Sequence, residues 1–328
     1  MANEVEKVAL IAVSNIEKID LITVANMEKI SGMEISSGSS HTWSSAGAMH
    51  DAMSGAGGHA IGLVNTAVVV AGGYEGAFTD DTQERNGTTW TTESPTISAT
   101  RQEAGMGGSS TSGLIFGGWA GAGGNLNITE EYGGSSWSSG GNIPTSKGAN
   151  RGCGTSQTDM LEALGRDEGT AGVTGGKTAS TYNGTSWSAI TVPPTGSSYN
   201  GSFGEASAGY FCGGDGYPSA MNHIHYWNGA SWTTDPSSAT MRIYQFQQGF
   251  SFGSSSDAVV GGGAGATTSG DSYAANQDHA DKWNGSAFSA TSTVPYGKND
   301  CMGAGVVTGG TCFGGGGGSY VDTCVTYA

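Results

Sequence analysis

Histidine and cysteine are the side chains that most often bind metals or act as nucleophiles, and both are scarce in this chain. Its 328 residues include six histidines and five cysteines. His223 and His225 alternate, so on a strand they would face the same side, a spacing compatible with a metal-binding pair. No motif surrounds the other histidines, and two adjacent loop histidines are the simpler interpretation. We predict neither a metal site nor a cofactor.

The cysteines predict no disulfide framework. Their number is odd, and no two of them have the CxxC spacing of a metal or redox site. Free cysteine is among the most frequently buried residue types, so we expect small buried thiols. The five positions are Cys153, Cys212, Cys301, Cys312 and Cys324.

Motifs of the common enzyme classes are missing. The sequence contains no serine nucleophile elbow, no HExxH zinc helix, no P-loop and no EF-hand loop. The acidic pairs Asp80 with Asp81 and Asp278 with Asp281 could contribute to a calcium site, but two carboxylates in a loop are usually solvated. We therefore predict that the chain is not an enzyme, and we assign no catalytic residue.

The charge of the chain excludes several kinds of partner. The formal net charge is −16, with only 12 Lys and Arg residues. A protein that binds nucleic acid through the phosphates needs a basic stripe, which this sequence lacks. The same charge disfavours an anionic membrane surface. The apolar run at residues 8–13 is too short to span a bilayer or to serve as a signal peptide, so we expect no membrane insertion.

The elements that would position any site are repeated hairpins. The segment TYNGTSW, residues 181–187, has variants that end at Trp90, Trp137, Trp232 and Phe288. Each copy places an aromatic residue or Arg before Asn-Gly or Gly-Gly, then two small residues and an aromatic residue. Asn-Gly and Gly-Gly provide the positive φ that a type I′ turn requires at both central positions, so each copy predicts a β-hairpin.

A second marker precedes each hairpin. It is a short apolar run that ends in two glycines, which we interpret as a strand followed by a loop. One repeat unit therefore contains four strands, and its most variable loop follows the paired glycines, with the shortest such loop after Gly176. The runs are VVVAGG ending at Gly73, LIFGG at Gly118, AGVTGG at Gly176, GYFCGG at Gly214 and AVVGGG at Gly263.

The spacing of the hairpins predicts a β-propeller. Successive hairpin aromatics from Trp90 to Phe288 lie 47, 50, 45 and 56 residues apart, which is the period of four-stranded propeller blades. The last unit stops at Tyr327, before its outer strand, whereas residues 39–45 around Trp43 form an outer strand with no unit before it. We therefore predict an all-β, six-bladed β-propeller with four-stranded blades, closed by this N-terminal outer strand.

The repeat resembles a known family. The apolar-Gly-Gly run, the later aromatic residue and the Trp five residues after it resemble the kelch-type β-propeller, and the YNGTSW form is similar to propellers in tail-fibre and other virion proteins of bacteriophages. The resemblance covers residues 36–328 and departs from the pattern at Arg85 and Phe288. A sialidase would have Asp two residues before the hairpin glycine, and these positions hold Arg85, Tyr182, Trp227 and Trp283.

The resemblance implies a phage virion surface protein, a tail fibre or spike head that binds a host-surface glycan through its propeller loops. Assembly in the host cytoplasm would require no signal peptide. Two alternatives stay open. One is a glycan-active enzyme whose residues converge from several blades, and the other is a non-enzymatic capsid or tail decoration protein.

Candidate ligand-binding residues lie in the loops after the paired glycines. Insertions in repeat proteins collect on one face, which is often the binding face. Most of these loops bring one aromatic residue, and aromatic rings suit sugars because the C–H groups of a sugar pack on them. The alternative is that the rings cover the seams between blades. The residues are Tyr74, Trp119, Tyr217, Tyr273 and Tyr320.

A second candidate site is the mouth of the propeller channel. The loops that lead from one blade to the next carry Pro and then a basic residue, and these loops approach the axis. The resulting ring of cations could bind an anion or an acidic sugar. Alternatively, each cation pairs with carbonyl groups and carboxylates of the neighbouring blade, which we favour because a recurring charge is more often structural. The candidates are Arg101, Arg242 and Lys298.

Residues 1–35 differ in composition from the propeller. They contain three copies of an eleven-residue apolar repeat, which in helical form gives helices that supercoil right-handedly. The β-branched residues 19–24 are also compatible with stacked β-turns, although we favour the helix. Either form carries too much apolar surface to stay solvated, so we predict an attachment segment that binds other virion proteins or forms a homo-oligomer, with a trimer favoured. The alternative is that it packs against its own propeller.

Overall fold

The computed structural model divides into two units, Met1–Ser40 and His41–Ala328. The prediction for residues 1–35 lies outside the described residues. Within the described part, no helix is long and apolar enough to cross a membrane. The structure describes residues 41–55, 60–93, 95–167, 176–215, 224–235, 244–247, 249–266, 278–297, 299–316 and 320–328.

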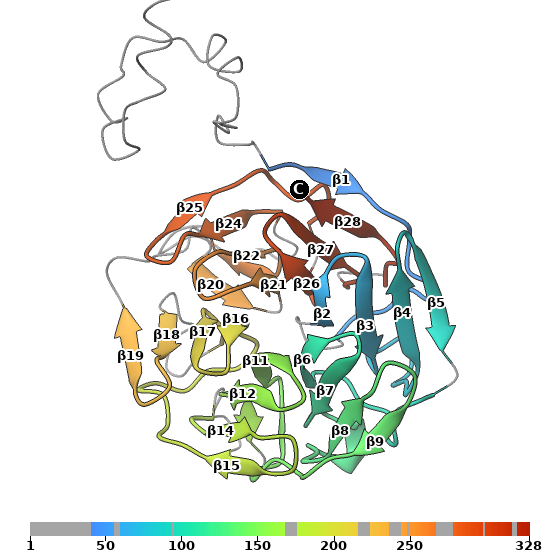
Figure 1. Cartoon of the computed structure of the whole chain (residues 1–328). Coiled ribbons are helices and arrows are strands. Elements are labelled where there is room, and N and C mark those ends of the chain that lie inside the picture. The colour runs from blue at the N-terminus through green and yellow to red at the C-terminus, as the bar shows by residue number, and fades with distance from the viewer. Residues whose placement is uncertain are drawn as a thin grey trace, which may run out of the picture. The chain divides into compact units, whose positions relative to one another are not determined.

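The second unit is a six-bladed β-propeller, as the repeat spacing predicts. Six antiparallel sheets of four strands surround a common axis (Figure 1). Figure 1 shows one strand of each blade nearest the axis, namely β2, β6, β11, β16, β21 and β26. Among the described residues the other regular structure is two short strand pairs and one short 3-10 turn, Gly121–Gly123.

The first three blades follow one another along the chain. Blade 1 contains β2 (Ile61–Val64), β3 (Ala67–Ala71), β4 (Thr82–Asn86) and β5 (Thr89–Glu93). Blade 2 contains β6 (Gly105–Ser109), β7 (Ser112–Phe116), β8 (Thr129–Tyr132) and β9 (Trp137–Ser139). Blade 3 contains β11 (Arg151–Ser156), β12 (Asp159–Ala163), β14 (Ala179–Tyr182) and β15 (Trp187–Ala189).

The other three blades repeat this order. Blade 4 contains β16 (Gly201–Glu205), β17 (Ala208–Cys212), β18 (Ile224–Trp227) and β19 (Trp232–Asp235). Blade 5 contains β21 (Phe250–Gly253), β22 (Ala258–Gly261), β24 (Ala280–Trp283) and β25 (Phe288–Ala290). Blade 6 contains β26 (Met302–Val306), β27 (Gly309–Phe313), β28 (Cys324–Tyr327) and, from the other end of the chain, β1 (Trp43–Ser45). Two short pairs complete the set, β10 (Lys147–Gly148) with β13 (Arg166–Asp167) and β20 (Tyr244–Gln247) with β23 (Ala264–Ala266).

The ring closes through β1. This strand pairs antiparallel with β28, with Trp43 opposite Tyr327 and Ser45 opposite Val325. The Trp43 indole N–H also donates to the carbonyl oxygen of Ser292, 3.1 Å away in the loop after blade 5. The N-terminal strand therefore completes the last blade and ties it to its neighbour, as predicted.

The second strand of blade 3 differs from the prediction. The run ending at Gly176 carries the paired glycines, but the strand that pairs with β11 and β14 is β12. This strand ends at Ala163, thirteen residues before Gly176, and precedes Leu164-Gly165. Leu164 has φ 66°, the left-handed value that Gly117 has at the same place in blade 2 (62°). Because leucine stands where the other blades have glycine, the sequence marker was hidden. The loop of this blade therefore begins at Gly165, not after Gly176.

The hairpin turns also differ from the type I′ prediction. Tyr182 pairs with Trp187, so four residues form the turn, and only Gly184 among them has positive φ (90°). The Asn183 side chain instead accepts hydrogen bonds from the backbone N–H groups of Thr185 and Ser186, each at 3.0 Å. The asparagine caps the turn through its side chain and needs no left-handed backbone.

The two ends of the propeller carry different connections between strands. One end carries the turns between the first and second and between the third and fourth strands of each blade, and we call it the hairpin face. The other end carries the loops after the paired glycines and the connections between blades, and we call it the loop face. His41 stacks on Tyr327 (ring centroids 5.2 Å apart) at the start of β1, so the first described residue lies at the hairpin face.

Packing between blades explains the repeated residues. The hairpin tryptophans bond to the preceding blade, because the indole N–H groups of Trp137 and Trp187 donate to the hydroxyls of Thr82 and Thr129, each at 2.9 Å. Near the axis a side chain would not fit, since a Cβ atom on Gly303 would lie 2.6 Å from the Ser251 carbonyl oxygen of the adjacent inner strand. All five cysteines are free and buried, as expected.

Candidate functional site

The loop aromatics that the structure describes come together on the loop face. Tyr320, Tyr74, Phe78 and Trp119 form a continuous row, with ring centroids 5.5, 5.3 and 5.3 Å apart in that order. We call these four residues the aromatic arc. It crosses from blade 6 over blade 1 to blade 2, so the rings cover two seams between blades. Tyr320 is exposed and the other three are half-buried, which leaves ring surface accessible.

Phe78 was not among the ligand-binding residues predicted from the sequence. It lies four residues after Tyr74 in the same loop and pairs with it through an isolated β-bridge, so no repeat marks it. The other candidates in this set, Tyr217 and Tyr273, lie outside the described residues.

Backbone hydrogen bonds fix the position of the arc. Tyr74 exchanges two of them with Ser54, at 2.8 and 3.1 Å, and Trp119 exchanges two with Gln102, at 2.7 and 3.0 Å. Each aromatic residue directly follows the paired glycines of its blade. The same position holds Arg166 in blade 3 and Asp215 in blade 4, so one backbone frame presents different side chains around the axis.

The residues next to these bridges have an unusual backbone conformation. At the entry to the inner strands, φ is 69° at Gly55, 58° at Glu103, 52° at Ala149, 59° at Tyr199 and 54° at Asp300. We call these five residues the axial ring. Four of them are not glycine, although the left-handed conformation costs other residues about 1–2 kcal/mol each. Such strain persists only where the surrounding structure enforces it, and it concentrates at functional sites.

Hydrogen bonds between neighbouring blades hold the axial ring. The N–H of Gly55 donates to the carbonyl oxygen of Asp300 (3.4 Å), that of Glu103 to Gly55 (2.5 Å), and that of Tyr199 to Ala149 (3.1 Å). These bonds run from blade to blade around the axis. The side chains of the ring are therefore gathered at the centre of the loop face.

A group of polar side chains from four blades lies at this centre. The Tyr199 hydroxyl donates to Glu103 Oε1 (3.0 Å), and Arg166 donates to Glu103 Oε2 (3.1 Å) and to the Tyr199 hydroxyl (3.2 Å). The Arg166 guanidinium also lies over the rings of Trp119 and Tyr199, 5.9 and 5.8 Å from their centroids. With Arg151 and Asp300 these residues form what we call the axial cluster: Glu103, Arg151, Arg166, Tyr199 and Asp300. Trp119 belongs to the aromatic arc and touches the cluster.

Charges in the axial cluster influence one another across the axis. Burial raises the pKa of Asp300 to about 6, with a further increase from Glu103 that Arg151 partly opposes. Burial lowers the pKa of Arg151 to about 10, and Glu103 and Asp300 act in the opposite direction. Arg151 donates to the carbonyl oxygens of Asn200 (2.8 Å) and Asn150 (3.0 Å). Burial and Glu103 also raise the pKa of Tyr199, so its hydroxyl stays protonated.

Arg101, a candidate for the channel mouth, is buried within the propeller. Its side chain is fully buried, forms an ion pair with Glu130, and donates to the carbonyl oxygens of Gly117 (3.2 Å) and Ile128 (3.3 Å). Lys147 does the same in the next blade, where it reaches Glu162 at 2.6 Å. Both cations satisfy groups of an adjacent blade, which is the structural alternative considered for this position. Arg242 and Lys298 lie outside the described residues.

His225, one member of the possible metal-binding pair, makes side-chain hydrogen bonds within the propeller. Both ring nitrogens of the buried His225 lie 2.8 Å from threonine hydroxyls, Nε2 from Thr195 and Nδ1 from Thr234. Within the described part of the chain, no group of three or more His, Cys, Asp and Glu residues could hold a metal ion. His223 is not among those residues.

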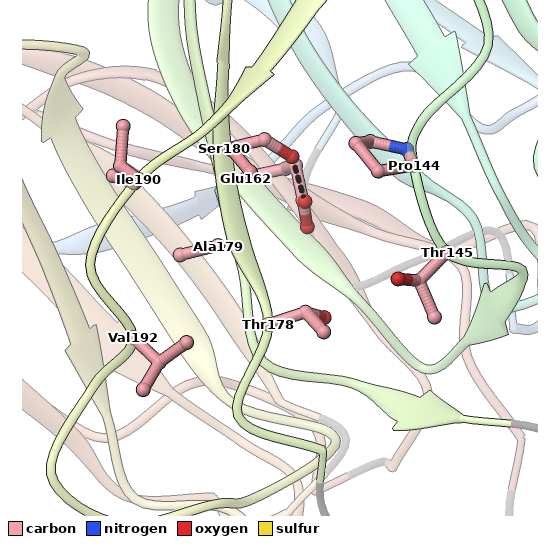
Figure 2. Close-up of a pocket in the computed structure, with 9 residues that line it drawn as sticks. Pro144, Thr145, Glu162, Thr178, Ala179, Ser180, Ile190 and Val192 are labelled. Carbon is pink, nitrogen blue, oxygen red and sulfur yellow. Dashed lines mark hydrogen bonds between the residues drawn. The ribbon is translucent and has the colours of Figure 1, made fainter.

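A small pocket lies at the seam between blades 2 and 3 (Figure 2). Its volume is about 90 Å³. Figure 2 shows the hydrogen bond from Ser180 to Glu162 between Pro144 on one side and Ile190 and Val192 on the other. Because Glu162 also binds Lys147, its carboxylate is already neutralised. The pocket has room for only a few water molecules, so a sugar ring would not fit.

A larger cavity of about 200 Å³ opens at the hairpin face, at the opposite end of the axis. Leu63 and Val306 are exposed beside it, and Glu205 brings a carboxylate. This lining is mostly backbone and offers few directional side-chain groups. Its walls are the six equivalent glycines at the ends of the inner strands, Gly62, Gly108, Gly154, Gly204, Gly253 and Gly305.

Comparison with known proteins supports the fold. No protein-family model matches the chain, and no curated protein sequence matches it significantly. Among solved structures, the chain is similar to that of YjhT, with a TM-score of 0.66 and 14% sequence identity over 84% of this chain and 95% of YjhT. At this identity the likeness shows the fold alone. The chain is therefore a six-bladed β-propeller.

Proposed function

We propose that the chain is a virion surface protein, of the kelch-like type found in phage tail fibres, that binds a host-surface glycan through its loop face. The observation that carries the proposal is that the aromatic arc and the axial cluster lie on the same face and meet where Arg166 contacts Trp119. Aromatic rings provide stacking surface for sugars, and converging polar groups fix the orientation of a bound ligand.

The arrangement supports binding because it is already formed. Each ring of the aromatic arc packs against the next. Backbone bridges to Ser54 and Gln102 also fix the positions of Tyr74 and Trp119. A ligand would therefore order few side chains when it binds. Such preorganisation lowers the entropic cost of association.

Residues 1–35 belong to the proposal as an attachment or oligomerisation segment. The net charge of −16 suits an exposed surface that must not adhere to its own copies. Binding of other virion proteins and assembly into a trimer belong to this proposal.

The test is binding of the full-length protein to polysaccharides isolated from candidate host bacteria. We expect Trp119→Ala to weaken binding by about 1–3 kcal/mol, within the range for aromatic anchors of an interface. Tyr226→Ala is a matched control, because Tyr226 is a half-buried aromatic residue in the middle of β18, away from the arc. Unchanged binding by folded Trp119→Ala and Tyr74→Ala variants would contradict the proposal.

One observation favours the alternative of a glycan-active enzyme. The axial carboxyls differ in environment, since Glu103 is paired with Arg166 whereas burial raises the pKa of Asp300, and such a difference is typical of acid and base pairs. Against it, the Tyr199 hydroxyl donates a hydrogen bond to Glu103 and has a raised pKa, so it is not an activated nucleophile. Shortening of the polysaccharide during the binding assay, lost in Asp300→Asn, would establish the enzyme.

A further inference from the structure

The axial ring carries polar side chains at alternate positions. Gly55, between Asp300 and Glu103, has no side chain, and Ala149, which bonds to Tyr199, has only a methyl group. Tyr199 reaches past Ala149 to bind Glu103. Three polar groups from blades 2, 4 and 6 are thus spaced around the axis, with Gly55 between Asp300 and Glu103 and Ala149 between Glu103 and Tyr199.

Hydrogen-bonding capacity remains at this centre. Among the described residues we find no hydrogen-bond partner for the Asp300 carboxyl group, which is half-buried. A carboxylate can accept about four hydrogen bonds and a hydroxyl can both donate and accept. A ligand rich in hydroxyl groups would use this capacity.

The charges at the centre favour a neutral ligand. The centre contains two carboxyl groups, those of Glu103 and Asp300, and two guanidinium groups, those of Arg151 and Arg166. Both arginines are engaged, Arg166 by Glu103 and Arg151 by two backbone carbonyl oxygens. Among the described residues of the centre, an anionic ligand would meet two carboxyls and no cation without a partner. Glu75, on the same face, has a pKa raised to about 7 by burial and by Asp51 and Asp81, so the surroundings are acidic as well.

The geometry of the ring determines the direction of approach. The bonds from Gly55 to Asp300, from Glu103 to Gly55 and from Tyr199 to Ala149 join three of the seams at the axis, those of blade 6 with blade 1, blade 1 with blade 2, and blade 3 with blade 4. A group therefore reaches the axial cluster along the axis from the loop face. The end of a glycan can enter in this way, whereas the middle of a chain cannot.

We propose that the axial cluster is a binding subsite for one terminal residue of a neutral glycan, whose hydroxyl groups bond to Glu103, Tyr199 and Asp300 while the next residue stacks on Trp119. This inference rests on the proposed glycan binding. It adds that the axial cluster binds a terminal residue and that the glycan is neutral. The aromatic arc alone would bind any stretch of a polysaccharide. The axial cluster makes recognition depend on a chain end.

The experiment uses the full-length protein and saturation-transfer NMR with methyl glycosides of common neutral hexoses and N-acetylhexosamines, alongside glucuronic acid and N-acetylneuraminic acid. We expect transfer to at least one neutral glycoside and none to the acids. Glu103→Gln and Asp300→Ala should weaken binding about tenfold or more, because each removes a hydrogen bond to a charged group. Asp300→Asn, which keeps one acceptor, should retain part of it.

Asp257→Asn is the matched control, since Asp257 is an exposed carboxylate at the hairpin face that pairs with Lys282 at 3.4 Å. The inference is overturned if no neutral glycoside binds, if an acidic sugar binds more tightly, or if the Glu103 and Asp300 variants bind as the wild type does. In each case, polysaccharide binding that still depends on Trp119 would leave the proposed function intact. Loss of both kinds of binding from the wild-type protein would remove the proposed function too.

Discussion

Single residues at the axis show what the sequence could not reveal. Glu103, Ala149, Tyr199 and Asp300 share a left-handed backbone, yet their side chains have nothing in common. Since glycine is the usual sequence marker of this conformation, four other residue types at equivalent positions leave no pattern to find. The loop aromatics were predictable because type and position both recur. The axial cluster became visible only when the blades were placed around one axis.

The strain at these residues can be measured by comparing two small replacements. At Asp300, φ is 54°, so we expect Asp300→Gly to be more stable than Asp300→Ala by about 1 kcal/mol, because alanine keeps the left-handed penalty that glycine avoids. Both variants lose the same carboxyl group. Chemical denaturation of the two proteins measures the difference.

The control is the same pair of replacements at Ser138, an exposed residue of β9. There the order should reverse, with glycine less stable than alanine by about 0.5–1 kcal/mol. An alanine variant at Asp300 that equals or exceeds the glycine variant would mean that the axial ring is not strained.

At the scale of elements, the repeat predicted the strands better than the turns and loops. Strand pairing follows from alternation and glycine spacing, which the sequence displays, and the hairpins occur where Asn-Gly marked them. The geometry of the turn depends on its length, and the four-residue loop from Asn183 to Ser186 uses the asparagine side chain instead of its backbone. In blade 3, Leu164 occupies the position where the other blades have glycine. The later Gly-Gly pair that ends at Gly176 was therefore mistaken for the end of the strand.

The capping asparagines give a test of this turn. Asn183, Asn228 and Asn284 each accept two backbone N–H groups at 2.9 to 3.0 Å. Replacing one of them by Ala should lower the free energy of unfolding by about 1 kcal/mol, comparable to the loss of an N-cap. Asn86 pairs with Thr89 around a two-residue turn and belongs to β4.

Asn86→Ala is therefore the matched control and should cost clearly less than the other three. Thermal or urea unfolding of the four single variants measures the effect. Equal losses of unfolding free energy at Asn86 and Asn183 would show that the side-chain caps contribute nothing specific. Asparagine would then matter only for the backbone conformation that it prefers.

For the whole molecule, the architecture could be read from the sequence because every blade repeats one pattern and the two chain ends complete each other. The axial cluster could not, since it combines side chains from blades 2, 3, 4 and 6 that are separated by up to about two hundred residues. A site of this kind is specified by the closure of the ring. Its geometry therefore depends on β1 holding blade 6, which carries Asp300, against blade 5.

Deletion of residues 39–45 tests this dependence. It removes β1, exposes the backbone edge of β28, and removes Trp43, whose ring packs against Phe250, Phe252 and Tyr327 at centroid distances of 5.4, 6.3 and 4.9 Å. Loss of the half-buried Trp43 ring costs less than the about 3–5 kcal/mol of a fully buried tryptophan, and an open strand edge promotes aggregation. We expect a large fall in the thermal midpoint, with association of the deleted protein in light scattering.

Deletion of residues 32–38 removes the same number of residues but keeps the closing strand, so its propeller should unfold at the midpoint of the intact protein. Trp43→Ala separates packing from strand pairing, and should fall between the two deletions because β1 can still pair with β28. If the protein without residues 39–45 unfolds at the intact midpoint, β1 does not close the ring. If it stays folded but loses only terminal-sugar binding, closure positions Asp300 without being needed for stability.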